Sequence, residues 1–189
     1  MQAFLGQCLM GTLDPFLIPV TGLKPGNHLF DFRIDASFFS QFEYGEIKEG
    51  LVEVRLEIMK EAKHMDINFH IKGKVVVPCD RCSDPVMIFI EGDRKLIAKF
   101  GNEYQEVSDE IQIIPDTVNR FDVRSYIFEY IQLLIPQKRE HQTDHNGVSQ
   151  CNPEVLKKLR ELTGEHRPDP RWEILGQYRE SIKIHHKKQ

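Results

Sequence analysis

The feature that most constrains the fold is a strict alternation of apolar and polar residues along two neighbouring stretches. Residues 51–58 read LVEVRLEI, which places the apolar side chains of Val52 to Ile58 opposite three charged ones. The same period resumes after the polar stretch KEAKH and runs from Met65 to Val77. A strand with one buried face has this period of two. The two stretches therefore predict a long antiparallel hairpin.

Four further stretches predict strands, and three predict helices. Residues 29–35 alternate in the same way, and VMIFIEG, RKLIAKFG and EIQII are rich in strand-forming residues. Gly73 interrupts a strand pattern and indicates a bulge or sharp bend. FDVRSYIFEYIQLLIP has helical spacing, with Asp122 as N-cap and Pro136 as its end. NPEVLKKLRELTG and DPRWEILGQYRESI predict two short helices.

These elements predict an α+β fold, in which an antiparallel β meander of about six strands is packed by one long helix. The two short helices follow at the C-terminal end. We expect an N-terminal extension over 1–12, an α+β domain over 13–136, a polar loop over 137–150 and a C-terminal helical tail over 151–189. We expect the chain to start at Met1 or at Met10.

Cellular location can be inferred from what the sequence lacks. No apolar run approaches the roughly 18–20 residues that a membrane span needs. The first residues have no basic segment and no small-residue cleavage site of a secretory signal. Four cysteines are too few and too unevenly spaced for a disulfide scaffold. We therefore expect a cytoplasmic protein without membrane contact.

The charge is distributed unevenly along the chain. The net charge is −4, but residues 1–137 carry 14 basic and 21 acidic side chains, whereas residues 138–189 carry 11 basic and 8 acidic ones. Affinity for nucleic acid comes mostly from Lys and Arg that neutralise phosphates. An acidic body with a mildly basic tail therefore fits a basic protein partner at least as well as it fits RNA.

The sharpest local motif is Cys79-x2-Cys82, which lies between two predicted strands. Two thiolates at this spacing can bind one tetrahedral zinc ion, and the remaining ligands must come from distant residues. Candidates are His141, His145 and Cys151 on the polar segment after the long helix. A reduced turn without metal and a redox-active thiol pair remain open alternatives. The redox alternative is disfavoured, because thioredoxin-type pairs sit at a helix N-terminus and strand follows Cys82.

Catalytic motifs are absent from the sequence. It contains no phosphate loop, no G-x-S-x-G, no H-E-x-x-H and no glycine-rich dinucleotide turn. We therefore expect no enzymatic activity, no catalytic residues and no small-molecule substrate.

The combination of motifs resembles the YceD family of large ribosomal RNA subunit accumulation proteins. The resemblance rests on GKVVVPCDRCSDPV, on YIFEYIQLLIP followed by His141 and Cys151, and on PDPRWEIL, and it covers about residues 13–178. It implies a non-enzymatic role in the synthesis, processing or stability of large-subunit ribosomal RNA. It also implies a possible zinc site at Cys79, Cys82, His141 and Cys151, with His145 as the alternative histidine. The implied partners are a large-subunit precursor, a ribosomal protein and/or large-subunit rRNA.

Two other functions compete with a ribosome-assembly adaptor. A direct RNA-binding, zinc-knuckle-like protein would need aromatic side chains on an exposed strand face. Phe30, Phe32 and Phe69 instead fall on the expected core face. A C-x2-C thiol oxidoreductase would need a reactive cysteine of low pKa.

Overall fold

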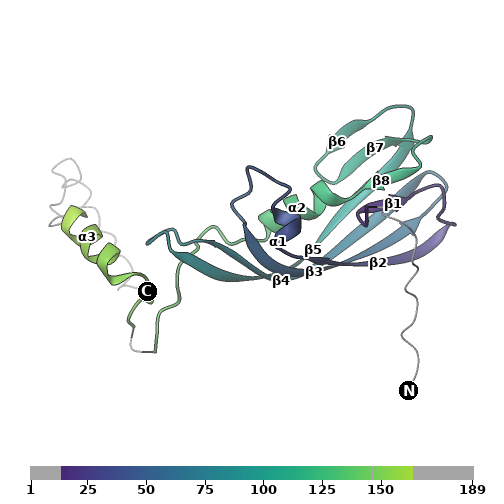
Figure 1. The fold of residues 1–189 in the computed structure, drawn as a ribbon. Coiled ribbons are helices and arrows are strands. Elements are labelled where there is room, and N and C mark those ends of the chain that lie inside the picture. The colour runs from purple at the N-terminus through teal and green to yellow at the C-terminus, as the bar shows by residue number, and fades with distance from the viewer. Residues whose placement is uncertain (1–13, 146, 164–189) are drawn as a thin grey trace, which may run out of the picture. The chain divides into compact units, whose positions relative to one another are not determined.

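The computed structural model describes residues 14–145 and 147–163. The chain divides into two compact units, Met1–His141 and Gln142–Gln189, and each is described by itself. In the described part of the first unit, a six-stranded sheet carries two helices on one of its faces (Figure 1). The same unit also contains a two-stranded sheet.

The described elements follow one another along the chain as eight strands and three helices. The strands are β1 (Leu17–Pro19), β2 (Gly26–Ile34), β3 (Glu49–Lys60), β4 (His64–Pro78), β5 (Pro85–Gly101), β6 (Gln105–Ser108), β7 (Ile111–Pro115) and β8 (Arg120–Asp122). The helices are α1 (Ala36–Phe39), α2 (Arg124–Leu133) and, in the second unit, α3 (Pro153–Thr163). The large sheet has the order β2-β3-β4-β5-β7-β6, and β1 pairs with β8.

The predicted hairpin is confirmed as β3 and β4, which pair antiparallel from Lys60 with Met65 to Glu49 with Val76. The alternating apolar side chains of both strands form the core, because a pleated strand sends every second side chain to the same face. Leu56 and Phe69, which face each other across the two strands, are both fully buried. Burial of this apolar face is the main stabilising contribution to the sheet.

The meander is only partly antiparallel. β5 is one continuous strand of 17 residues, where two strands were predicted, and it pairs in parallel with β7. β6 lies outside β7 at the edge of the sheet and pairs with it antiparallel. The chain thus runs out along β6 and returns along β7, which gives β7 the direction of β5. The prediction of an all-antiparallel sheet was wrong at this edge.

The prediction of one long helix was also wrong, because α2 has only ten residues. Asp122 belongs to β8, and the N-cap is Val123; the Asp122 carboxylate still accepts the Arg124 N–H at 2.9 Å. The helix ends before Ile135, whose helical conformation the ring of Pro136 disfavours. Its buried side chains pack on the sheet, and the Tyr130 ring meets Phe69 edge to face at 5.0 Å.

The first of the two predicted C-terminal helices is present as α3. Asn152 precedes it, and its side-chain oxygen accepts the Glu154 N–H at 3.1 Å, as an N-cap does. The second predicted helix, over DPRWEILGQYRESI, lies outside the described residues.

Gly73 marks no bulge, because the ladder passes through it without a shift and pairs it with Val52 and Ile90. A Cβ at this position would lie 2.4 Å from the Leu51 carbonyl oxygen and 2.6 Å from the Val52 Cα. The glycine therefore permits a close approach of two backbones, a role that glycine serves inside strands.

We predict that Gly73→Ala lowers the free energy of unfolding by about 1–3 kcal/mol, since the added methyl group must displace backbone of β3. Gly22→Ala is the matched control, because its Cβ would meet nothing closer than 3.7 Å. Urea denaturation of both variants measures the difference. Equal stability of the two would contradict the close approach.

Candidate metal centre

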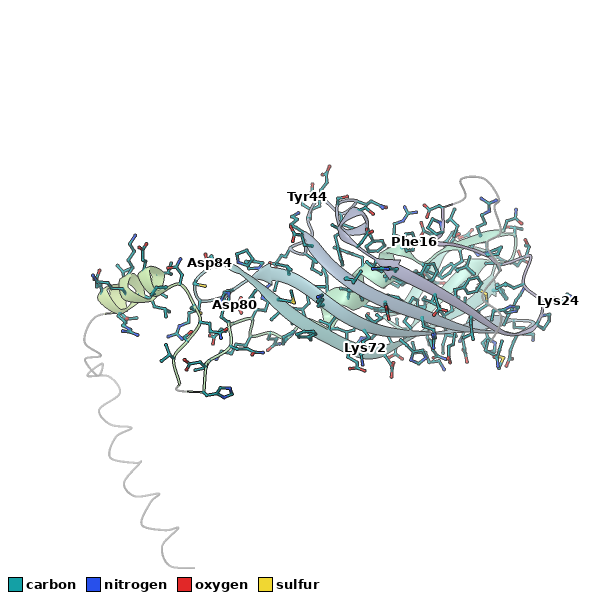
Figure 2. The ribbon with its side chains drawn as sticks, turned by 60° about the horizontal axis from the view of Figure 1, so that its bottom comes forward. Phe16, Lys24, Tyr44, Lys72, Asp80 and Asp84 are labelled. Atoms are coloured by element: carbon teal, nitrogen blue, oxygen red, sulfur yellow. The ribbon has the colours of Figure 1, made fainter. Side chains whose placement is uncertain are left out.

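The two cysteines of the C-x2-C motif lie on the turn that joins β4 to β5. The ladder between these strands ends with Pro78 opposite Pro85, so residues 79–84 form the turn. The Cys79 N–H donates to the Asp84 carbonyl at 2.9 Å, and the Ser83 N–H donates to the Cys79 carbonyl at 2.9 Å. Figure 2 labels Asp80 and Asp84 at this end of the hairpin. The strand pairing thus fixes the turn that carries both sulfur atoms.

Ser83 adopts the left-handed backbone conformation, with a φ of 63°. This region is unfavourable for residues other than Gly, Asn and Asp, so the backbone at Ser83 is strained. The reversal after Cys82 lets the chain return into β5 within a few residues. This unfavourable backbone conformation directly follows Cys82, at the point where the two sulfur atoms are brought together.

A pair of reciprocal hydrogen bonds ties this turn to the segment after α2. The Asp80 N–H donates to the Arg139 carbonyl at 2.8 Å, and the Arg139 N–H donates to the Asp80 carboxylate at 2.7 Å. The Arg139 guanidinium binds the same carboxylate, with its Nη2 at 3.0 Å, and also contacts Glu46. The backbone N–H and the guanidinium of Arg139 lower the pKa of Asp80 below its ordinary value. We call this contact the Asp80–Arg139 clasp; it fixes the chain two residues before His141.

His141 lies against the same turn. Its Nδ1 is 3.5 Å from the Cys82 Sγ, and its Nε2 is 3.2 Å from the Pro85 carbonyl oxygen. A carbonyl oxygen can only accept, so the Nε2 carries the proton in the neutral ring and Nδ1 presents its lone pair toward the sulfur. Metal-bound histidines in proteins are oriented by this kind of bond from the second nitrogen.

A short hairpin joins His141 to Cys151, which is ten positions further along the chain. Thr143 and Ser149 form a β-bridge, and the Gln150 N–H donates to the Gln142 carbonyl at 3.1 Å. The Asp144 carboxylate accepts the Val148 N–H at 2.7 Å within the hairpin. Because residues 142 and 150 are hydrogen-bonded, the hairpin keeps His141 and Cys151 close in space despite their spacing in the sequence.

Four of the five candidate ligands form one group. The ligand atoms of Cys79, Cys82, His141 and Cys151 all lie within 4.8 Å of one another. His145 is exposed in the turn of the short hairpin and is not part of the group. Of the two candidate histidines, the structure therefore places His141, and not His145, beside the three sulfur atoms.

The group suits zinc by its chemistry and by its dimensions. Three thiolates and one imidazole are a donor set that structural zinc sites use. With Zn–S of about 2.3 Å and Zn–N of about 2.0–2.1 Å, a tetrahedral site has sulfur–nitrogen edges of about 3.6 Å. The observed separation of 3.5 Å between Cys82 and His141 matches that edge. Zinc at this site would cross-link three stretches of chain that are distant in sequence.

The electrostatics of the turn favour the thiolate that a metal requires. Burial by itself raises the pKa of the Cys79 thiol, but the backbone N–H groups of Arg81, Cys82 and His141 and the His141 side chain outweigh this and lower it to about 6. The Arg81 N–H lies 3.5 Å from the Cys79 sulfur. Amides directed at sulfur in this way stabilise its negative charge.

The same sulfur atoms are poorly placed for redox catalysis. Cys79, Cys82 and Cys151 are 2%, 5% and 4% exposed. A catalytic or redox-sensing thiol has to be reached by its substrate, whereas buried cysteines are inert unless they bind a metal. The geometry therefore favours a metal site over a thiol oxidoreductase.

The Asp80–Arg139 clasp could not be predicted from the sequence. No periodicity or spacing signals an ion pair between residues 59 positions apart. The position of Asp80 between the two cysteines was the one hint in the sequence. A carboxylate at this position lies close to any chain segment that packs against the turn.

Comparison with protein families identifies residues 67–178 as matching YceD, described as large ribosomal RNA subunit accumulation protein. The match covers more than half of the chain and includes all four members of the cysteine–histidine group. The chain belongs to the YceD family. Searches of curated proteins and of solved structures each gave no match. Among the described residues of this YceD-family protein, no helix is long and apolar enough to cross a membrane.

We predict that the purified protein contains one zinc ion per chain and that His141→Ala removes it, because the mutation deletes one of four ligands. His145→Ala is the matched control and should keep the ion. Cys82→Ser should lose zinc. Cys8→Ser, which replaces the cysteine outside the proposed ligand group, should keep it. Elemental analysis after exhaustive dialysis measures the content. Equal zinc in His141→Ala and His145→Ala would exclude the assignment.

Proposed function

We propose that this protein is a non-enzymatic factor of ribosome biogenesis that promotes the accumulation of large-subunit ribosomal RNA. The observation that carries this proposal is the YceD match over residues 67–178. In the proposal, the protein acts by contacting a basic protein component of the large-subunit precursor. Zinc bound by the cysteine–histidine group stabilises the fold and takes no part in a reaction.

The exposed side chains of the large sheet support a protein partner over RNA. Cations on this face are matched by carboxylates on neighbouring strands, as in the pairs Arg55–Asp31 at 2.8 Å and Lys72–Glu91 at 2.9 Å. Lys72, labelled in Figure 2, is one of these paired cations. Phosphate binding needs an excess of Lys and Arg that this face does not have.

Phe32 and Phe69 are not available for base stacking on the sheet. Phe69 is fully buried, and Phe32 stacks on Phe16 with ring centroids 5.4 Å apart. These rings are occupied by packing within the protein, whereas RNA-binding sheets present their aromatic side chains to solvent.

The acidic charge is concentrated at one edge of the fold. Residues 101–119, which include β6 and β7, contain five acidic side chains and neither Lys nor Arg. A surface of one sign attracts a partner of the opposite sign and raises the rate of association. We therefore propose this acidic edge as the surface that meets the basic partner.

The proposal predicts that reversing charge at the acidic edge weakens co-sedimentation with large-subunit precursors. The test variant is Glu103→Lys with Glu110→Lys. The control, Glu154→Lys with Glu161→Lys in α3, changes the net charge by the same amount elsewhere. Sucrose-gradient fractions of cells that carry tagged protein are probed for the tag. The Glu103→Lys, Glu110→Lys variant should move to the fractions that contain unbound protein, and the control variant should not.

Two results would contradict the proposed function. One is capture of neither large-subunit RNA nor its proteins by the tagged wild-type chain. The other is turnover of a small substrate that is lost when either Cys79 or Cys82 is replaced, because that result would make the sulfur atoms catalytic.

A further inference from the structure

Both oxygens of the Asp80 carboxylate are bound to Arg139. One of them, Oδ2, accepts the Arg139 backbone N–H at 2.7 Å. The other, Oδ1, accepts from the guanidinium, with Nε at 3.1 Å and Nη2 at 3.0 Å. The Asp80 N–H in turn donates to the Arg139 carbonyl at 2.8 Å. Backbone and side chain thus join the two residues at once, which fixes their relative position more firmly than a lone surface ion pair does.

Glu46 holds the third part of the Arg139 side chain. The guanidinium Nη1 contacts the Glu46 carboxylate, which comes from the segment between α1 and β3. The Arg139 side chain is only 22% exposed, although Glu46 itself is exposed. A guanidinium offers five donors in a planar fork, so it can bind two carboxylates in fixed directions, which a lysine ammonium cannot do. Arg139 is therefore held in one orientation by Asp80 and Glu46 together.

The Asp80–Arg139 clasp is close to the proposed metal ligands along both of its chain segments. Asp80 directly follows Cys79 and precedes Cys82 by two positions, and Arg139 precedes His141 by two positions. Two residues of chain span at most about 7 Å, so a fixed Arg139 confines His141 to the neighbourhood of the turn. The bond from His141 to the Pro85 carbonyl then orients the ring. Hydrogen bonds that need no metal therefore constrain three of the four ligands.

We propose that Asp80 and Arg139 are positioning residues of the metal centre. They hold the cysteine turn and His141 together before the ion binds, and they thereby raise the affinity of the site for zinc. Ordering a flexible ligand on binding costs conformational entropy, and a site whose ligands are already in place loses less of it. This inference rests on the structural zinc of the proposed function and identifies the residues that prepare its site.

A clasp that only stabilised the fold would behave differently. Its loss would lower the free energy of unfolding equally with and without zinc, and the zinc affinity of the folded chain would not change. If the clasp positions the ligands, its loss lowers the affinity, so that zinc stabilises the variant less than it stabilises the wild type. Urea denaturation in excess zinc and in EDTA therefore separates the two roles.

The first test compares two aspartates of the same turn, Asp80 and Asp84, both labelled in Figure 2. In Asp80→Asn an NH2 group replaces one acceptor oxygen, so the side chain cannot accept from both the backbone and the guanidinium of Arg139. We expect this change to weaken zinc binding about 10–100-fold, the usual effect of losing an outer-shell partner. Asp84→Asn removes the same charge outside the clasp and should bind zinc as the wild type does. Competition with a chelator of known affinity measures both. Equal weakening would overturn the proposal, because charge and not position would then set the affinity.

The second test compares two arginines. Arg139→Ala should weaken zinc binding by a similar factor, whereas Arg81→Ala, which removes an exposed cation from the cysteine turn, should not. The double variant Asp80→Asn, Arg139→Ala should bind zinc about as well as the weaker of the two single variants, because residues that act as one unit are not additive. Fully additive losses would show that the two residues act independently and would overturn the proposal.

A third measurement examines the histidine before any metal binds. In the full-length chain with EDTA, the nitrogen NMR shifts of the His141 ring should show the proton fixed on Nε2, as the bond to the Pro85 carbonyl requires. In Asp80→Asn the shifts should move toward those of a free imidazole, which exchanges between its two tautomers. Free-imidazole shifts in the metal-free wild type would overturn the proposal, since His141 would then not be held in advance.

Failure of this inference can be told apart from failure of the proposed function. If the wild-type chain binds zinc and co-sediments with large-subunit precursors while Asp80→Asn keeps its full zinc affinity, only the role of the clasp is wrong. If the clasp variants lose zinc affinity as expected and the wild-type chain captures no ribosomal component, the clasp stands and the ribosomal role is wrong. A wild-type chain that binds no zinc would overturn the inference together with the structural zinc.

Discussion

The unbroken ladder between β4 and β5 sets the positions of both the cysteine turn and the strands of the acidic edge. It runs in one register from His64 opposite Lys99 to Pro78 opposite Pro85. At one end it closes in the turn that carries Cys79 and Cys82, and at the other β5 pairs with β7 and forms the acidic edge. Because side chains on a strand alternate between faces, a slip of one residue would move the whole apolar set out of the core. The register thus positions the two cysteines of the turn at one end of β5 and the acidic edge at the other.

Much of this arrangement could be predicted from the sequence, since burial imposes a periodicity on residues that are near one another in the chain. The β3–β4 hairpin follows from alternation over LVEVRLEI and the stretch from Met65. The α3 N-cap follows from Asn152 and Pro153. What escaped prediction depends on contacts between distant residues. The parallel pairing of β5 with β7, the backbone approach at Gly73 and the Asp80–Arg139 clasp have no local signature.

The choice between two histidines shows the same limit. His141 and His145 are four positions apart, and spacing allowed either of them to join the cysteines without a preference. The structure distinguishes them because the clasp fixes residue 139, while the hairpin over residues 142–150 turns His145 to solvent. A ligand that follows an anchored backbone loses less conformational entropy on binding a metal than one on an exposed turn. The clasp therefore explains the position of His141, although neither Asp80 nor Arg139 is a proposed metal ligand.

We propose that three buried sulfur atoms and one imidazole hold a structural metal in this YceD-family protein. Zinc K-edge X-ray absorption on the purified full-length chain is the decisive measurement. We expect a first shell of three sulfur atoms at about 2.3 Å and one nitrogen at about 2.0–2.1 Å. A first shell made of oxygen or nitrogen alone, or a protein that binds no zinc, would contradict it.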